Sequence, residues 1–320
     1  MTDKKNCPLH KTSIGGQAVI EGVMMRGPES IAVAVKKPDK EIVIDKKPIG
    51  KVRRNKILKL PIIRGVVNFF DSLIVGLQAL TFSAKFFDLD ENGNQIEETP
   101  SKFEQWLEKK LSGDKFAKAV TYLGVCLGIV LGVLLFFMLP TFIAGFVGKN
   151  ISSSILKNLI EGLIRIVIFL GYMFMCSKMS DIKRVFSYHG AEHKTIFCYE
   201  AGEELTVENV RKYSCHHPRC GTSFLFVVMI ISILVFAVVS WSNVFIRMAL
   251  RIVLLPVVVG ISYEINRFVG RHENLFTKIL TAPGLALQNL TTFEPDDEMI
   301  EVGIEALKLV IPEQEGADKW

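Results

Sequence analysis

The sequence predicts a mainly α-helical, polytopic membrane protein with about four transmembrane helices and a small N-terminal cytosolic region rich in β-strands. Hydrophobic residues make up 49% of the 320 positions, and they gather in long blocks without charges. A helix needs about 20 apolar residues to cross the hydrocarbon core of a bilayer, and several of these blocks are long enough. The first residues contain no apolar run of signal-peptide length, so we expect no cleaved signal.

The apolar blocks form two pairs that place the four predicted spans. Residues 119–177 hold the first two helices, and residues 220–268 hold the third and fourth. The four blocks run from Ala119 to Gly148, from Leu159 to Ser177, from Cys220 to Ile246 and from about Met248 to Tyr263.

Charged residues near the span ends raise the alternative of a polar pathway, as in a transporter. Glu161 and Arg165 are spaced as an i, i+4 pair, and Arg251 begins the fourth span. Such residues pair, reach along the helix toward the interface or line a cavity. Their position near the span ends favours side chains that reach toward the interface, and a transporter is the least favoured function.

The connection between the second and third spans, residues 178–219, is rich in lysine and arginine, whereas the loops within each pair are short and nearly uncharged. Because positively charged loops stay on the cytoplasmic side, this connection and both termini are expected to face the cytoplasm. The soluble cysteines are then expected to be reduced and free to act as ligands.

Residues 1–59 predict a cytosolic, basic, β-rich region. Residues 30–37 and 41–47 alternate apolar and polar side chains around a turn, and the glycines that precede them suit tight turns or close backbone contacts. The stretch Lys36–Lys59 has ten basic residues against three acids, which favours contact with lipid head groups. A ribosome or translocon contact is the alternative for this stretch, and no DNA binding is expected.

Residues 60–118 predict amphipathic or interfacial helices and a linker. The apolar positions after residue 60 recur at helical spacing but are interrupted by Arg64 and Asp71, which favours a helix lying on the membrane or on the β-rich region over a fifth span. The question whether residues 60–87 span the membrane stays open. Residues 269–320 predict two cytosolic helices broken at the sequence FEPDD.

The segment YHGAEHKTIFCYE, residues 188–200, carries the first half of a candidate metal site in the 178–219 insert. On a helix, His189 and His193 lie on one face about one turn apart, so both can bind one ion. Glu192 lies beside them, within reach of a water on that ion. The pattern formally matches the H-x-x-E-H motif of inverzincin peptidases, in which the glutamate is the general base.

The segment CHHPRC supplies the second half through Cys215, His217 and Cys220. Two histidines and two thiolates would form a closed, structural zinc site. His189, His193 and one of Cys215, His217 or Cys220 would instead leave a coordination position open for water, with Glu192 as the catalytic base. We therefore expect a divalent metal, zinc, and leave both arrangements open.

The sequence resembles the YqhQ-like family of bacterial membrane proteins, a family of unknown function. The resemblance rests on the stretches GGQAVIEGVMMRGP, RGVVNFFDSLIVGLQAL, HGAEHKTIFCYEAGEELTVENVR, HPRCGTSF and TAPGLALQNLTTFEPDDEMIEV. It implies a four-span protein of the bacterial inner membrane, often labelled a metal-dependent enzyme. The family's His-Pro-Arg-Cys element corresponds here to His217–Cys220 and leaves Cys215 outside it.

Two hypotheses for the function follow. The first is a metal-dependent hydrolase that acts at the membrane surface on a peptide or on a small, lipid-derived molecule. The alternative is a non-enzymatic factor for membrane biogenesis or translation, in which the metal only stabilises the cytosolic part of the protein.

Overall fold

The computed structural model describes residues 10–49, 57–86, 114–149, 151–238, 244–272, 274–314 and 316–319. They belong to two units. One is drawn from Met1–Asn94, Met173–Ser232 and Val253–Trp320, and the other from Gln95–Tyr172 and Ile233–Ile252. The predicted linker after residue 87 and the basic residues 51–56 lie outside the described residues.

An antiparallel sheet of four strands opens the first unit and confirms the predicted β-rich region. Its strands follow chain order: β1 (Gly15–Val19), β2 (Gly22–Arg26), β3 (Ser30–Lys36) and β4 (Ile42–Pro48). The sequence predicted β3 and β4 but read the glycines of β1 and β2 as turns or close contacts. Gly22 does make such a contact, because a Cβ at this position would overlap the carbonyl oxygen of Ala34 on β3.

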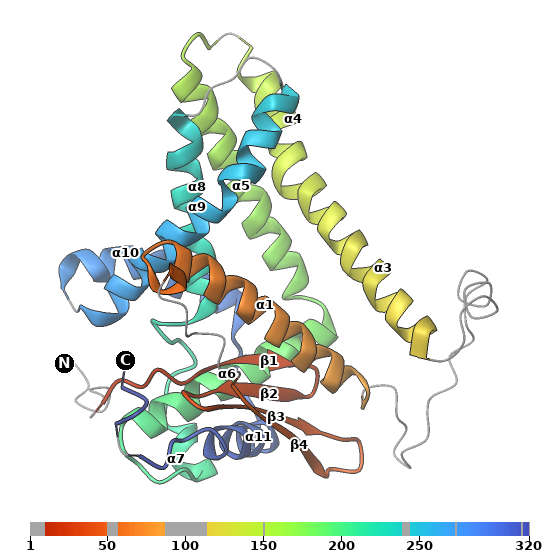
Figure 1. Cartoon of the computed structure of the whole chain (residues 1–320), viewed down its shortest axis with the longest axis vertical. Coiled ribbons are helices and arrows are strands. Elements are labelled where there is room, and N and C mark those ends of the chain that lie inside the picture. Colours follow the sequence, from red (N-terminus) through yellow and green to blue (C-terminus); the bar gives the residue numbers. More distant parts are fainter. Residues whose placement is uncertain are drawn as a thin grey trace. The chain divides into compact units, whose positions relative to one another are not determined.

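Both faces of the sheet are covered by helices (Figure 1). On one face, Val23, Met25 and Ala34 form a core with α6 (Ser180–Glu200) and α11 (Asp297–Lys308). On the other face, Met24, Val33 and Val35 form a second core with Ala79 of α1 (Ile63–Ala84). The alternation of buried side chains along β2 and β3 thus places the sheet between α1 and the pair formed by α6 and α11.

The first unit also contains several shorter helical elements. They include the 3₁₀ turn η3 (Ile57–Lys59), α7 (Val207–Arg211) and α10 (Leu275–Thr291). The apolar helices α8 (Gly221–Val238) and α9 (Val244–Arg271) each begin in one unit and end in the other. The second unit also contains α3 (Asp114–Val133), the π-helical turn η4 (Leu134–Met138), α4 (Leu139–Val147) and all but the last four residues of α5 (Ser154–Cys176).

Four helical segments among the described residues are long and apolar enough to cross a membrane: Ile63–Ala84, Tyr122–Val147, Ile155–Cys176 and Ala249–Arg271. The chain is therefore a membrane protein, as its hydropathy predicts. Three of these segments match the first, second and fourth predicted blocks. The third predicted block corresponds to the shorter apolar helix Gly221–Ala237, beyond which residues 239–243 are not described.

The helix α1 is long and apolar enough to cross a membrane, although the sequence favoured an amphipathic helix there. Its Val75, Ala79 and Phe82 side chains pack on the sheet, and Arg26 of β2 donates a hydrogen bond to Asp71 at 2.5 Å. The helix therefore lies on the β-rich region, and Asp71, which interrupts its apolar pattern, is used in that contact.

Three charged residues of the second unit, Glu161, Arg165 and Arg251, turn inward and form a buried network. Arg251 donates to both carboxylate oxygens of Glu161, Thr141 donates to Glu161 at 2.7 Å, and Arg165 lies 3.3 Å from the same carboxylate. Glu161, Arg165 and Arg251 are at most 7% exposed. The i, i+4 pair is as predicted, but these side chains do not reach outward as expected, because their mutual pairing offsets the cost of burial.

Candidate metal centre

The helix α6 holds the first half of the candidate site between β1 and α11 of the first unit. Tyr188, Ala191 and Ile196 belong to the core that α6 forms with the sheet and α11. These apolar positions fix the rotation of α6, which places His189, Glu192 and His193 toward the cavity described below.

Close backbone contact fixes α6 from a second side. Gly190 lies against the carbonyl oxygen of Phe293, which a Cβ at this position would overlap, and the Phe293 amide donates to the carbonyl oxygen of Phe186 at 3.0 Å. The same region carries Thr291, a hydrogen-bond partner of His189. The glycine in the sequence YHGAEH therefore lets the segment after α10 pass beside both histidines.

We expect Gly190→Ala to displace this segment and to destabilise the protein by about 1–3 kcal/mol, because backbone cannot move aside as a side chain can. The amount of metal bound per chain should also decrease in this variant. Gly221→Ala is the matched control, since the space around Gly221 is open although it adjoins Cys220. Thermal unfolding and metal content of both purified variants check the prediction, and equal behaviour of the two would contradict it.

The structure brings three of the predicted ligands together. One donor atom from each of His189, His193 and Cys220 lies within 4.8 Å of the other two. The Nε2 atom of His189 is 3.1 Å from the Cys220 sulfur, and the two histidine rings are 4.4 Å apart between centroids. Cys220 immediately precedes α8, so the ligands come from two segments that the fold joins.

Hydrogen bonds to carbonyl oxygens set the tautomer of both histidines. His189 Nδ1 donates to the carbonyl oxygen of Thr291 at 2.9 Å, and His193 Nδ1 donates to that of Cys215. A carbonyl oxygen only accepts, so each Nδ1 carries a proton and Nε2 is the ring nitrogen that faces the site. Metal-binding histidines are oriented by bonds of this kind.

Burial controls the charge of the histidine and cysteine ligands. It lowers the pKa of His193 to about 4, which keeps this ring neutral near pH 7. Burial opposes ionisation of the Cys220 thiol, but the His193 ring and the amide and hydroxyl of Thr222 outweigh it and lower the thiol pKa. A neutral imidazole and a thiol that ionises easily are the forms that bind zinc.

Glu192 lies beside the three donors. Its Oε1 atom accepts a hydrogen bond from the Gly16 amide at 2.9 Å, and its Oε2 atom lies 3.9 Å from His189 Nε2. Burial raises the pKa of Glu192 to about 7. Within the described residues, Glu192 Oε2 and His193 Nε2 are both buried and have no hydrogen-bond partner. Two such atoms in one cluster are unusual, because buried polar atoms are normally satisfied.

These four residues line a cavity of about 620 Å³ in the first unit. Its wall is mainly apolar near α1 and α8, where Phe69, Leu73 and Phe224 contribute. Gly16 brings the backbone of β1 against Glu192, where a larger residue would overlap the sheet. The site thus has room for a ligand on the side that Glu192 and His189 face.

Cys215 and His217 lie outside the three-donor group. The Cys215 thiol donates to Glu294 at 3.0 Å, and only the carbonyl oxygen of Cys215 reaches the site. His217 Nε2 lies 3.8 Å from Glu200, while Gln288 holds the backbone of His217 through bonds of 2.7 and 2.8 Å. The sequence left open a closed site with four ligands and an open site with three. The structure brings together the three ligands of the open site, His189, His193 and Cys220.

Glu200 is a supporting residue whose role the sequence did not assign. It is 1% exposed, accepts the Thr12 amide at 2.8 Å and is bonded by Arg219 of the CHHPRC segment. It therefore ties the start of the described chain, α6 and the loop before Cys220 together. Its position on the histidine face of α6 was the only signal for this in the sequence.

Comparison with known proteins agrees with the resemblance seen in the sequence. The family described as "Protein of unknown function (DUF1385)" matches residues 60–313. The "Uncharacterized protein YqhQ" of Bacillus subtilis (strain 168) is 36% identical over 294 residues, which cover 91% of this chain and 90% of that relative. No solved structure matches the chain. A match over most of the chain shows that this protein belongs to the DUF1385 family, with YqhQ as a relative.

Proposed function

We propose that this protein is a zinc-dependent hydrolase of the bacterial inner membrane. The observation that carries the proposal is the pair of buried, unpartnered atoms, His193 Nε2 and Glu192 Oε2, beside His189 and Cys220. An ion held by the three donors would satisfy His193, and a water on that ion would satisfy Glu192. A closed, structural zinc site would use His193 Nε2 but would leave Glu192 Oε2 without a partner.

The donor set fits zinc. Two imidazole nitrogens and one thiolate are typical zinc ligands, and a set of three protein ligands is characteristic of catalytic zinc, which keeps a position for water or substrate. The carbonyl oxygens of Thr291 and Cys215 already hold both imidazoles in the tautomer that ligation requires. Cys215 and His217 are engaged elsewhere, which favours the open over the closed site.

When bound, zinc supplies Lewis-acid activation of water and of a scissile carbonyl or phosphoryl group. Glu192 takes the proton of the attacking water at Oε2 and returns it to the leaving oxygen. The Gly16 amide holds Oε1, which keeps Oε2 aimed at the donors. The apolar wall formed by Phe69 and Phe224 limits water in the cavity and orients the substrate.

The charge pattern of the chain supports a cytoplasmic position for this site. The 178–219 segment, which carries α6 and the CHHPRC element, is the most basic of the connections between spans. We therefore propose that both termini are cytoplasmic and that the substrate reaches the cavity from the inner leaflet or from the cytosol.

A ribosome or translocon contact through Lys36–Lys59 stays a prediction. Part of this stretch is engaged within the chain, because Lys36 pairs with Glu298 at 2.9 Å and Lys37 pairs with Asp39 and Glu41. These pairs reduce the positive charge that β3 and the turn after it offer to an RNA or protein partner. They favour the hydrolase over the adaptor.

The test uses the full-length protein in nanodiscs made from bacterial inner-membrane lipid, in water enriched in oxygen-18. A hydrolase should release a product that carries one labelled oxygen, and a zinc chelator should abolish this release until zinc is restored. Mass spectrometry of the lipids and the soluble fraction measures it. Peptides are supplied as well as lipids. If zinc stays bound but no labelled product appears, the metal has a structural role instead.

A further inference from the structure

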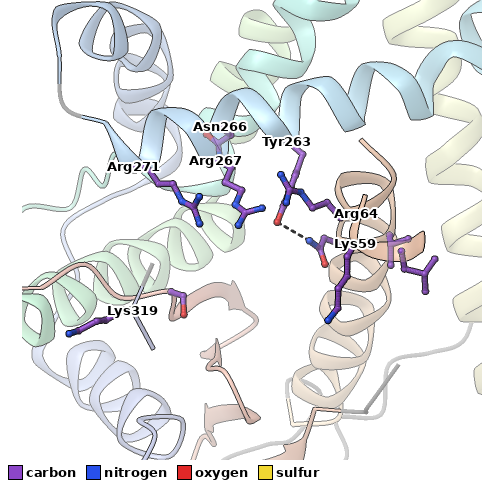
Figure 2. Close-up of a pocket in the computed structure, with 11 residues that line it drawn as sticks. Lys59, Arg64, Tyr263, Asn266, Arg267, Arg271 and Lys319 are labelled. Carbon is purple, nitrogen blue, oxygen red and sulfur yellow. Dashed lines mark hydrogen bonds between the residues drawn. The ribbon is translucent and has the colours of Figure 1, made fainter. Parts of the chain in front are cut away.

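A basic cleft of about 590 Å³ lies in the first unit beside the metal cavity (Figure 2). The positively charged residues that line it are Lys59, Arg64, Arg267, Arg271 and Lys319. No carboxylate lines it among the described residues, and the nearby Glu264 carboxylate pairs with Arg64 and interacts electrostatically with Arg267. In Figure 2, Arg267 and Arg271 extend from α9 into this space.

Several of these cations have donors that can bind a ligand. Arg64 is paired with Glu264, to which its Nε donates at 2.7 Å. Within the part of the chain that the structure describes, the side chains of Lys59, Arg267 and Arg271 make no hydrogen bond or close ion pair. Arginine presents a planar fork of donors that matches phosphate oxygens, and several together bind phosphate strongly.

The cleft adjoins the metal cavity. Ser13, Asn68, Tyr263 and Asn266 line both spaces. Asn68 donates to the Tyr263 hydroxyl at 2.8 Å and thereby links α1 to α9 at their boundary. One ligand can therefore have an anionic end among the arginines and its other end beside His189 and Glu192.

The basic residues lie at the ends of apolar helices. Arg271 is the last residue of the candidate span Ala249–Arg271, and Arg64 is the second residue of Ile63–Ala84. Basic residues at the ends of membrane helices lie at the level of the lipid head groups. Leu73 and Leu225, which line the cavity, are 53% and 47% exposed, so its apolar wall opens at the molecular surface.

We propose that the cleft binds the phosphate group of the hydrolase substrate, and that this substrate is an anionic, phosphate-bearing lipid. Its head group lies between Arg267 and Arg271, and its apolar part follows Phe69, Leu73 and Leu225. The bond that is cut then lies between these two parts, at the metal centre. Cleavage of this lipid rests on the proposed hydrolase function, whereas its binding in the cleft does not.

The experiment measures binding to the full-length protein by native mass spectrometry and by competition in a neutral detergent. The probes are phosphatidylglycerol, its uncharged diacylglycerol counterpart and inorganic phosphate. We expect wild-type protein to retain phosphatidylglycerol but not diacylglycerol. Arg267→Gln and Arg271→Gln should each weaken retention by about tenfold, the effect of losing one charge-assisted hydrogen bond.

Lys278→Gln and Lys308→Gln, which change basic residues outside the cleft, are the matched controls and should leave retention unchanged. Equal retention by wild type and the double variant R267Q/R271Q would overturn the proposal. If inorganic phosphate binds the cleft as tightly as the lipid does, the phosphate site stands but the lipid substrate is refuted.

Zinc content, measured on the same samples, separates this inference from the proposed function. Bound zinc without selective lipid retention refutes only the phosphate-bearing substrate. Selective lipid retention without any zinc site refutes the hydrolase and leaves the cleft as a lipid-binding site.

Discussion

Replacing Glu192 by glutamine is expected to reduce hydrolysis by about 10²–10⁴-fold while zinc stays bound, because general-base catalysis contributes about this much. The glutamine has nearly the same shape, and its side-chain oxygen can still accept the Gly16 amide that Glu192 Oε1 accepts at 2.9 Å. It cannot take a proton from water. The loss should therefore appear in the rate of product release and not in folding.

Labelled-product release in oxygen-18 water, together with zinc content and thermal unfolding, measures this effect. Glu208→Gln is the matched control, since Glu208 is exposed on α7 and does not line the cavity. Full activity of Glu192→Gln would remove the proposed base and favour a structural metal. Loss of zinc in this variant would instead make Glu192 part of the metal's binding site.

Removing the Glu200 carboxylate is expected to cause the largest loss of stability. Glu200→Ala removes the carboxylate that pairs with Arg219, whose side chain is 9% exposed, and removes the acceptor of the Thr12 amide. Breaking a buried ion pair on one side costs about 3–5 kcal/mol. Since Arg219 directly precedes Cys220, the variant should also lose zinc affinity.

The contribution of Glu200 should depend on pH with a definite sign. Burial alone would raise the pKa of Glu200, but His217, Arg219 and the Thr12 amide outweigh burial and lower it. A carboxyl group whose pKa is lower in the folded state stabilises the protein above its unfolded pKa, about 4.3, and this stability is lost as the pH falls further.

The measurement is the unfolding free energy of wild type and Glu200→Ala in one detergent at pH 7 and at pH 4. The difference between them should be large at pH 7 and smaller at pH 4. Glu301→Ala, at an exposed position of α11, is the control and should match wild type at both pH values. A difference that grows toward low pH contradicts the assignment of Glu200 as a stabilising carboxylate.

Local sequence patterns predicted the parts of the fold that depend on local chemistry. The apolar blocks predicted a membrane protein, and the alternation in residues 30–47 predicted β3 and β4. The strands β1 and β2 were predicted only as part of a β-rich region and not one by one, because glycines, which are depleted in strands, occupy positions of close contact within the sheet and with Glu192 of α6. The packing of α1 on the sheet depends on contacts distant in sequence, which only weakly constrain its pattern.

In the candidate site, too, local sequence patterns predicted some features, whereas others depend on contacts between distant residues. The spacing of His189 and His193 on one helical face predicted that they lie together, and they do. The choice among Cys215, His217 and Cys220 needed the path of the loop, which is fixed by Glu200 of α6 and by Gln288, 71 positions from His217. The bond from Gly16 to Glu192 joins residues 176 positions apart, and no local pattern reveals such a contact.

The number and the ligands of bound zinc ions test the account most directly. We expect one zinc per chain, with an X-ray absorption spectrum that fits two imidazole nitrogens, one sulfur and one oxygen ligand. Cys220→Ala should lose this zinc, and Cys215→Ala should keep it, because the Cys215 thiol bonds Glu294 and not the site. A chain without bound zinc, or zinc with two sulfur ligands that is lost in Cys215→Ala, would contradict an open, catalytic site.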